Sequence, residues 1–260
     1  CAEREAQKID FLEKPHEMSR IKKVIGIVSG KGGVGKSLVT SMLAVTMNRM
    51  GYHTAILDAD ITGPSIPASF GIKELAHSDG KNIIPSITKT GIKVMSVNLI
   101  LDNPTQPVLW RGPVLGNAIS QFYENVNWGE LDYLLIDMPP GTGDVALTVF
   151  QSMPIDGVVL VSSPQDLVSM IVAKAVNMAK VMGIKILGLV ENMSYFKCPC
   201  CGEVAHIYGP SSLDSEAEKY GIENKAALPM KEDFARLVDA GNVEDIEIEE
   251  IKELVKNLMR

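Results

Sequence analysis

A glycine-rich stretch reads Gly30-Lys31-Gly32-Gly33-Val34-Gly35-Lys36-Ser37, and it fits the phosphate-loop pattern G-x-x-x-x-G-K-S/T. The mostly apolar residues 21–28 lead into this stretch, and residues 38–50, which have helical character, follow it. In such a strand–loop–helix unit the glycines let backbone N–H groups converge on phosphate oxygens, and the helix N-terminus adds a favourable dipole. An ordinary glycine-rich turn needs neither the lysine, the serine nor this context, so the stretch predicts a nucleotide-phosphate site.

The side chains of this loop have separate predicted roles. Lys36 can reach the β- and γ-phosphates of a nucleotide, and the Ser37 hydroxyl can ligate Mg²⁺. Lys31 is a second lysine, directly after the first glycine of the pattern. We predict that the nucleotide is bound by Gly30, Lys31, Gly32, Gly33, Val34, Gly35, Lys36, Ser37 and Leu38.

Strand-like and helix-like segments alternate along the rest of the chain. We expect strands at residues 24–29, 54–58, 92–98, 133–137, 157–162, 185–191 and 226–228. We expect helices at residues 114–125, 167–182, 212–220, 232–240 and 246–259, and mainly loop at residues 61–92. Continuous apolar strands separated by helices indicate a parallel sheet that is covered on both faces. The predicted fold class is therefore α/β: a P-loop NTPase with a mostly parallel sheet and helices on both faces.

The domain organisation follows from the same pattern. Residues 1–20 are polar and charged, and we predict that they form an N-terminal leader, helical or loose. Residues 21–260 are predicted to form a single P-loop ATPase domain with a cysteine loop near residues 195–202. No internal repeat or low-complexity tract interrupts the chain, so one domain is the simplest interpretation.

Composition and charge disfavour some classes of function. The 260-residue chain is 46% hydrophobic, which is enough for a sizeable core, and its formal net charge is −7. An acidic chain argues against broad nucleic-acid binding, although it leaves room for a local basic patch. No apolar run approaches the roughly 18 residues of a membrane-spanning helix, and the N-terminus lacks the apolar core of a signal peptide. We therefore expect a cytoplasmic protein without nucleic-acid or membrane partners.

Three aspartates at the ends of predicted strands are candidates for metal binding and catalysis. Asp58 and Asp60 follow the second strand, and Asp137 ends the strand of residues 133–137. Nucleotide hydrolysis needs a carboxylate near Mg²⁺ and a group that orients the attacking water, and ligands of open α/β sheets bind beyond the carboxyl ends of the strands. We assign Asp137 to Mg²⁺ as the Walker B carboxylate, Asp60 to the water, and Asp58 to Mg²⁺ through a water molecule. The alternative is that they are turn or helix-cap residues.

The segment after Asp137, residues 138–144, is rich in proline and glycine. Gly141 would let this loop approach the γ-phosphate, so the segment is a candidate sensor of the nucleotide state. A loop that is merely stiffened by its prolines is the alternative interpretation.

Three of the four cysteines fall within residues 198–201, and the fourth is Cys1. Cys198 and Cys201 have the C-x-x-C spacing that lets two thiolates point at one metal centre. Zinc or an iron–sulfur cluster usually takes four such ligands, and a symmetric dimer would supply them with two cysteines per subunit. Three interpretations stay open: a cluster or metal shared by a dimer; redox-active or inert cysteines; and a one-chain zinc site of Cys198, Cys200 or Cys201 and His206.

These segments together resemble the Mrp (ApbC) family of iron–sulfur cluster carrier ATPases. This family belongs to the deviant-Walker-A P-loop group, which also includes MinD, ParA and the nitrogenase iron protein. The resemblance runs from about Lys22 to Val243 and is carried by residues 29–37, 58–67, 110–113, 136–144, 191–194 and the C-P-x-C loop. Residues 58–67 are similar to switch I of this family rather than to that of MinD or ParA.

The resemblance implies roles for individual residues. Lys31 would reach across a nucleotide-sandwich dimer to the phosphates of the partner, Asn192 would contact adenine, and Pro229 lies where the family places further base contacts. Cys198 and Cys201 would bridge a [4Fe–4S] cluster between two protomers. Cys200 occupies the variable position of the C-P-x-C motif and has no assigned role.

The sequence thus predicts a cytoplasmic homodimer that binds ATP and Mg²⁺, hydrolyses ATP slowly and transfers a labile [4Fe–4S] cluster to apo iron–sulfur proteins. The predicted catalytic residues are Lys31, Lys36 and Asp60. The alternatives are a MinD/ParA-like positioning ATPase and a zinc-containing P-loop protein without carrier activity. A positioning ATPase would need a basic amphipathic C-terminal helix or a basic patch, whereas residues 244–253 are acidic.

Overall fold

The computed structural model describes residues 12–60, 63, 65–78, 80, 82–100, 112–141, 143–164 and 168–259. All of the predicted site residues lie within these ranges. Parts of other predicted segments lie outside the described residues: residues 1–11 of the leader with Cys1, Ile61, Thr62 and Pro64 of the switch-like segment, Trp110 and Arg111, Thr142, and Leu167.

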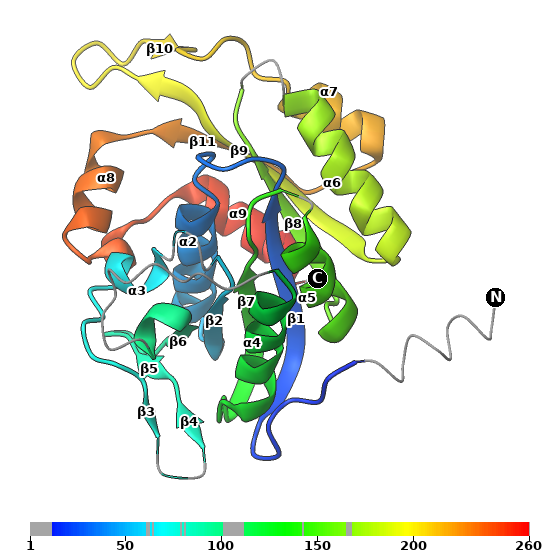
Figure 1. Ribbon diagram of the computed structural model, residues 1–260. Coiled ribbons are helices and arrows are strands. Elements are labelled where there is room, and N and C mark those ends of the chain that lie inside the picture. The colour runs from blue at the N-terminus through cyan, green and yellow to red at the C-terminus, as the bar shows by residue number, and fades with distance from the viewer. Residues whose placement is uncertain are drawn as a thin grey trace.

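A nine-stranded, mostly parallel sheet forms the centre of the structure (Figure 1). Its strands are ordered β10-β9-β8-β1-β7-β2-β6-β5, and β11 pairs with β9 off this path. The parallel strands are β1 (Arg20–Ser29), β2 (Thr54–Asp58), β6 (Lys93–Ser96), β7 (Glu130–Asp137), β8 (Gly157–Ser162), β9 (Lys185–Lys197) and β11 (Lys225–Met230). Two short strands, β5 (Ser86–Ile87) and β10 (Val204–Ala205), pair antiparallel with β6 and β9.

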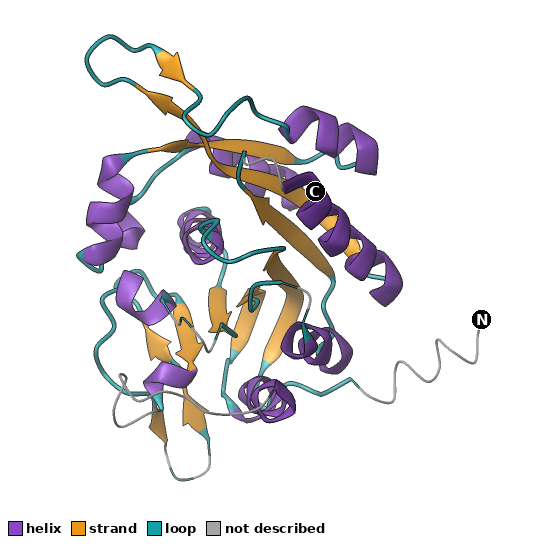
Figure 2. Cartoon of the chain, turned by 45° about the horizontal axis from the view of Figure 1, so that its top comes forward, coloured by secondary structure: helices purple, strands orange, loops and turns teal. Residues whose placement is uncertain are grey.

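Helices cover both faces of the sheet, and each face has its own core (Figure 2). One core takes residues from α4 (Gly112–Asn125), α5 (Asp144–Ser152), α6 (Val168–Met182) and α7 (Leu213–Tyr220). The other takes residues from α2 (Lys36–Arg49), α3 (Ile66–Ser69), α8 (Glu232–Asp239) and α9 (Glu249–Leu258). Because side chains alternate along a strand, Val24 and Val28 of β1 enter the first core, whereas Ile25 and Ile27 enter the second. The predicted α/β class is confirmed.

Several elements differ from the expected boundaries. β9 continues beyond residue 191 to Lys197, because its far end pairs with β11 and with β10. The strand expected at residues 92–98 ends at Ser96, whose side chain accepts a hydrogen bond from the Asn98 N–H and starts the 3-10 turn η1 (Val97–Leu99). The last helix begins at Glu249, after a second 3-10 turn, η2 (Val243–Asp245).

The described part of residues 61–92 is mainly loop, as predicted, and it also holds short regular elements. They include α3, β5 and a separate two-stranded antiparallel sheet of β3 (His77–Ser78) and β4 (Ile83–Ile84). These elements are only two to four residues long, so their periodicity gives almost no signal in the sequence.

The described end of the predicted leader, residues 12–19, forms coil and a turn rather than a helix. The Glu13 N–H donates to the Ser152 carbonyl at 2.8 Å, and the Trp128 N–H donates to the Ser19 hydroxyl at 2.9 Å. These bonds tie this segment to the α/β body. Among the helices in the described part of the chain, none combines the length and the apolar character that crossing a membrane requires.

Candidate functional site

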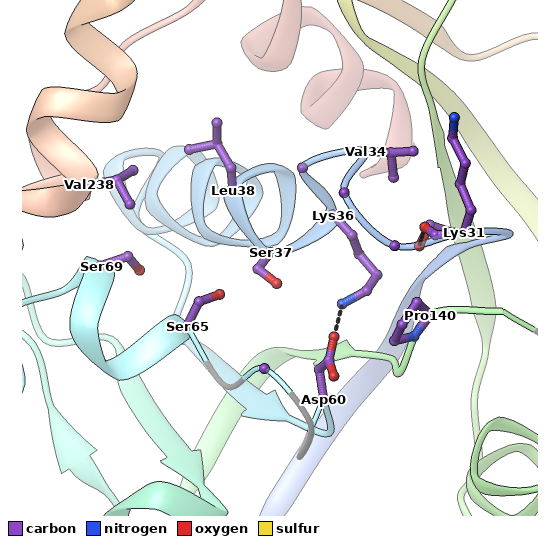
Figure 3. A pocket seen from close by; sticks show the side chains of 15 residues that line it. Lys31, Val34, Lys36, Ser37, Leu38, Asp60, Ser65, Ser69, Pro140 and Val238 are labelled. Carbon is purple, nitrogen blue, oxygen red and sulfur yellow. Dashed lines mark hydrogen bonds and ion pairs between the residues drawn. The ribbon is translucent and has the colours of Figure 1, made fainter. Parts of the chain in front are cut away.

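The phosphate loop joins β1 to α2 and borders a cavity of about 340 Å³ (Figure 3). Gly33 and Gly35 have φ angles of 81° and 80°, which is a region that favours glycine. Gly35 precedes the first turn of α2, and no side chain caps this end of the helix. The N–H groups at the start of α2 are therefore suited to bind phosphate oxygens.

The walls of this cavity contain most of the predicted nucleotide contacts. Of the predicted phosphate-loop residues 30–38, all but Gly30 line it. The remaining walls come from β1, from the segment around α3, from the loop after β7 and from α8, through Ser29, Asp60, Gly63, Ser65, Ser69, Pro140 and Val238.

Asp137 is the centre of a buried polar cluster beneath the phosphate loop. It ends β7 with no exposed surface and accepts hydrogen bonds from the Ser37 hydroxyl at 2.6 Å and the Thr40 hydroxyl at 2.8 Å. The ammonium group of Lys36 lies 2.8 Å from the Asp137 carboxylate. The structure thus brings Asp137 into contact with Lys36 and Ser37, although Asp137 lies 100 residues after Ser37 in the sequence.

Asp58 lies beside this cluster, because β2 and β7 are neighbouring parallel strands and Asp58 pairs directly with Asp137. Burial and then the charge of Asp137 raise the pKa of the Asp58 carboxyl well above its usual range, against the lowering effect of Lys36. Its Oδ1 accepts the Asp60 N–H at 3.2 Å, whereas Oδ2 is buried without a hydrogen-bond partner among the described residues.

This set of oxygens fits a divalent cation. The buried carboxylates of Asp58 and Asp137 and the Ser37 hydroxyl are hard oxygen ligands of the kind that Mg²⁺ prefers. The unpartnered Oδ2 of Asp58 could bind the cation or a water molecule of its hydration shell. A bound cation would also relieve the repulsion between Asp58 and Asp137.

Asp60 and Lys31 occupy opposite sides of the Lys36 side chain (Figure 3). The Lys36 ammonium lies 3.7 Å from the Asp60 carboxylate, which is partly exposed to the cavity. Lys31 also lines the cavity, but its side chain points away from Lys36. Asp60 is therefore placed to act inside the cavity of its own chain, and Lys31 is placed at the rim.

A second groove of about 630 Å³ lies beside the phosphate loop and contains the two residues predicted to contact the base. Asn192 is buried, and its side-chain amide donates to the Val34 carbonyl at 2.9 Å. Pro229, in β11, lines the same groove. A side chain at position 35 would place its Cβ 2.2 Å from the Asn192 amide nitrogen, so glycine at this position is required for the contact.

The cysteines lie on a projecting antiparallel hairpin, residues 195–208, which we call the cysteine hairpin (Figures 1 and 2). Its strands pair through Phe196 with Ala205 and through Lys197 with Val204. Cys198 is half-buried, whereas Cys200 and Cys201 are exposed, and all three are free thiols. Hydrogen bonds from the backbone N–H groups of Cys201 and Cys200 lower the pKa of the Cys198 thiol.

The hairpin does not gather the ligands of the one-chain zinc site. The Nδ1 atom of His206 lies 3.0 Å from the Ser194 carbonyl oxygen. Within the described ranges, no three His, Cys, Asp or Glu side chains are grouped closely enough to hold a metal ion.

Two polar residues near the site, Thr40 and Glu191, were not predicted. Thr40 bonds to Asp137, and its position one helical turn after Lys36 was the available signal. Glu191 is almost fully buried and accepts the Ser194 hydroxyl at 2.6 Å and the Ser212 N–H at 3.1 Å. A glutamate inside an apolar strand was the only sign of that role.

Comparisons with known proteins identify the family of this chain. The model of the ParA-type family described as NUBPL iron-transfer P-loop NTPase matches residues 20–260. The chain belongs to this family. The resemblance noted from the sequence is thereby confirmed at the level of the family.

Curated relatives cover most of the chain. An iron–sulfur cluster carrier protein of Clostridium perfringens is 46% identical over 86% of this chain and 82% of its own length. An iron–sulfur cluster carrier protein of Saccharolobus solfataricus is 44% identical over 91% of this chain and 80% of its own length. The iron–sulfur cluster transfer protein NUBPL of Dictyostelium discoideum is 40% identical over 85% of this chain and 69% of its own length.

Solved structures support the fold. A nucleotide-binding protein from Archaeoglobus fulgidus in complex with ADP is 41% identical, has a TM-score of 0.81, and matches 97% of this chain and 96% of its own. The cell division ATPase MinD of Pyrococcus furiosus has a TM-score of 0.63 at 19% identity, over 92% and 97% of the chains, which shows a shared fold alone.

Proposed function

We propose that this chain is an iron–sulfur cluster carrier that binds ATP with Mg²⁺ and hydrolyses it slowly. One observation carries the proposal: Lys36 and Ser37 of the phosphate loop contact the strand-end carboxylate of Asp137 at 2.8 and 2.6 Å, in a chain that also presents a thiol hairpin. The names of the curated relatives and the ADP complex of the Archaeoglobus protein support the two halves of this proposal.

Nucleotide binding would exchange contacts that the structure already holds. The Lys36 ammonium would leave the carboxylates of Asp137 and Asp60 for the β- and γ-phosphate oxygens. Mg²⁺ would be held by Asp137 and the Ser37 hydroxyl, and by Asp58 through water. When bound, Mg²⁺ neutralises charge on the phosphates.

Hydrolysis would use the residue that faces the cavity from the end of β2. Asp60 would orient the attacking water, whose oxygen bonds to the γ-phosphorus as the bridging bond to ADP breaks, and would take up its proton. Lys31 lies at the rim, which is compatible with a role toward the phosphates of a second copy.

The cluster is the cargo of this reaction cycle. Each hairpin offers the free cysteines Cys198 and Cys201, so a homodimer would supply the four ligands of a [4Fe–4S] cluster. Apo iron–sulfur proteins would then receive the cluster. A reducing compartment, for which we propose the cytoplasm, would keep such exposed thiols reduced.

Metal and sulfide analysis after anaerobic reconstitution tests this proposal. We expect about four irons and four sulfides per dimer, together with saturable Mg²⁺–ATP binding. Zinc in place of iron would support the zinc-containing alternative. Neither metal in a protein that still binds ATP would remove the carrier function and favour a positioning ATPase.

A further inference from the structure

The groove beside the phosphate loop is lined both by residues of the phosphate loop and by residues of the cysteine hairpin. Gly33, Gly35, Leu38 and Val238 line both this groove and the phosphate cavity, so the two spaces adjoin. The lining of the groove also includes Phe196 and Ile207, which lie on the two arms of the cysteine hairpin. A ligand that extends from the phosphate loop into the groove therefore reaches the hairpin itself.

Hydrogen bonds make the hairpin a single unit behind these two side chains. Phe196 lies two residues before Cys198 and pairs with Ala205. The Cys198 N–H donates to the Glu203 carbonyl at 2.8 Å, and the Gly202 N–H donates to the Cys198 carbonyl at 2.9 Å. A shift of the hairpin at the groove would accordingly move the backbone that carries Cys198.

The chain bends at the start of the hairpin, next to the phosphate loop. Met193 has a φ angle of 58°, in the left-handed region that a methionine side chain disfavours, and it separates Asn192 from Ser194. Asn192 holds the phosphate loop through Val34, and Ser194 contacts His206 of the hairpin. These two contacts hold the start of the hairpin against the phosphate loop.

We propose that the cysteine hairpin reads the base of the bound nucleotide: a nucleobase in the groove contacts Phe196 and Ile207 and thereby sets the geometry and reactivity of the Cys198 loop. This inference rests on the proposed nucleotide site and adds a route from that site to the thiols. It identifies Phe196 and Ile207 as positioning residues for cluster binding.

The structure distinguishes this route from one that runs through the phosphates alone. The Asn192–Val34 bond joins the hairpin to the phosphate loop, so phosphate binding needs no new contact with the hairpin. Phe196 and Ile207 instead border the groove beside the phosphate loop, where we place the base. A ligand shifts a conformation only through contacts that differ between the two states, and these two side chains supply such contacts.

The test compares ligands with and without a base on the reduced, cluster-free full chain. Alkylation of Cys198 by iodoacetamide is followed by peptide mass spectrometry with no ligand, with ADP, and with inorganic tripolyphosphate, both ligands at concentrations that calorimetry shows to saturate. We expect ADP to change the alkylation rate by about fivefold, the lower end of usual coupling between sites, and tripolyphosphate to leave it unchanged.

Two variants on the hairpin serve as a matched pair. Ile207 is 58% exposed and lines the groove, whereas Val204 is 50% exposed on the same hairpin and does not line it. Ile207→Ser should bind tripolyphosphate normally but lose the ADP effect on Cys198, and Val204→Ser should keep that effect.

Each result has a definite meaning. Equal effects of ADP and tripolyphosphate, equal loss in both variants, or binding of ADP without any change at Cys198 would overturn the inference and leave the proposed ATPase intact. Failure of both ligands to bind would instead remove the proposed nucleotide site, and the inference with it.

Discussion

Asp58 and Asp137 lie opposite each other on the neighbouring strands β2 and β7, and both are almost fully buried. Burial and the charge of Asp137 raise the pKa of the Asp58 carboxyl. A carboxyl with a raised folded-state pKa binds a proton more strongly in the folded chain than in the unfolded chain. Its contribution to the free energy of unfolding therefore declines as the pH rises from about 4, the unfolded value, through the raised pKa.

Asp58→Asn should remove this penalty in the absence of ligand. We expect the variant to be more stable than the parent chain at pH 7 by about 1–2 kcal/mol and to show a weaker decline of stability with rising pH. Urea denaturation across the pH range measures both effects. With Mg²⁺ and ADP present the order should reverse, because the variant lacks a carboxylate for the cation. A variant that is less stable under both conditions would contradict the assignment of Asp58 to a charged metal site.

Asp60→Asn separates turnover from binding. The side chain faces the cavity at 3.7 Å from the Lys36 ammonium, so we assign it to the attacking water rather than to the nucleotide. The substitution should lower kcat by about 10²- to 10⁴-fold, the usual contribution of general base catalysis, with little change in the Kd for ADP. Single-turnover hydrolysis and calorimetry measure the two quantities.

Lys36→Ala provides the contrast to the Asp60 variant, because Lys36 is assigned to the phosphates themselves. The Lys36→Ala substitution should raise the Kd for ADP greatly, whether or not kcat also changes. If Asp60→Asn hydrolyses ATP at the parental rate, Asp60 has no part in the chemistry.

Much of the fold was predictable because its signals are local. Buried parallel strands are continuous apolar runs whose ends are marked in the sequence. β2 and β7 end at an aspartate, and β8 begins at a glycine. The meeting of Ser37, Asp58 and Asp137 was also predictable, because parallel strands end at the same edge of a sheet.

The contacts that depend on distant pairings were not predictable. β9 extends to Lys197 only because β10 and β11 pair with its far end. The bond from the Ser212 N–H to Glu191 requires the start of α7 to return to β9. No local pattern specifies such returns, since they depend on the packing of the whole sheet.

Gly35 and Gly32 offer a matched test of the phosphate loop. Gly35 has a positive φ angle, and a Cβ there would lie 2.2 Å from the Asn192 amide, whereas a Cβ at Gly32 would have nothing within 4 Å. Gly35→Ala should lower the free energy of unfolding by about 1–3 kcal/mol, and Gly32→Ala should change it by less than about 1 kcal/mol. Urea denaturation of the ligand-free chain gives both values. Equal destabilisation in the two variants would show that the Asn192 contact does not restrict position 35.

The cysteine hairpin separates cluster ligands from a neighbouring thiol within the same loop. Cys198 and Cys201 have the spacing for a shared cluster, and Cys200 is exposed between them. Serine at both Cys198 and Cys201 should abolish reconstitution of the cluster, measured by iron and sulfide content and by charge-transfer absorption, and Cys200→Ser should load about four irons per dimer like the parent chain. Because the loop is at the surface, none of these substitutions should change stability or Mg²⁺–ATP binding appreciably. Full loading of the double variant would show that other groups hold the cluster, and loss of loading in the Cys200 variant would show that the middle thiol is a ligand.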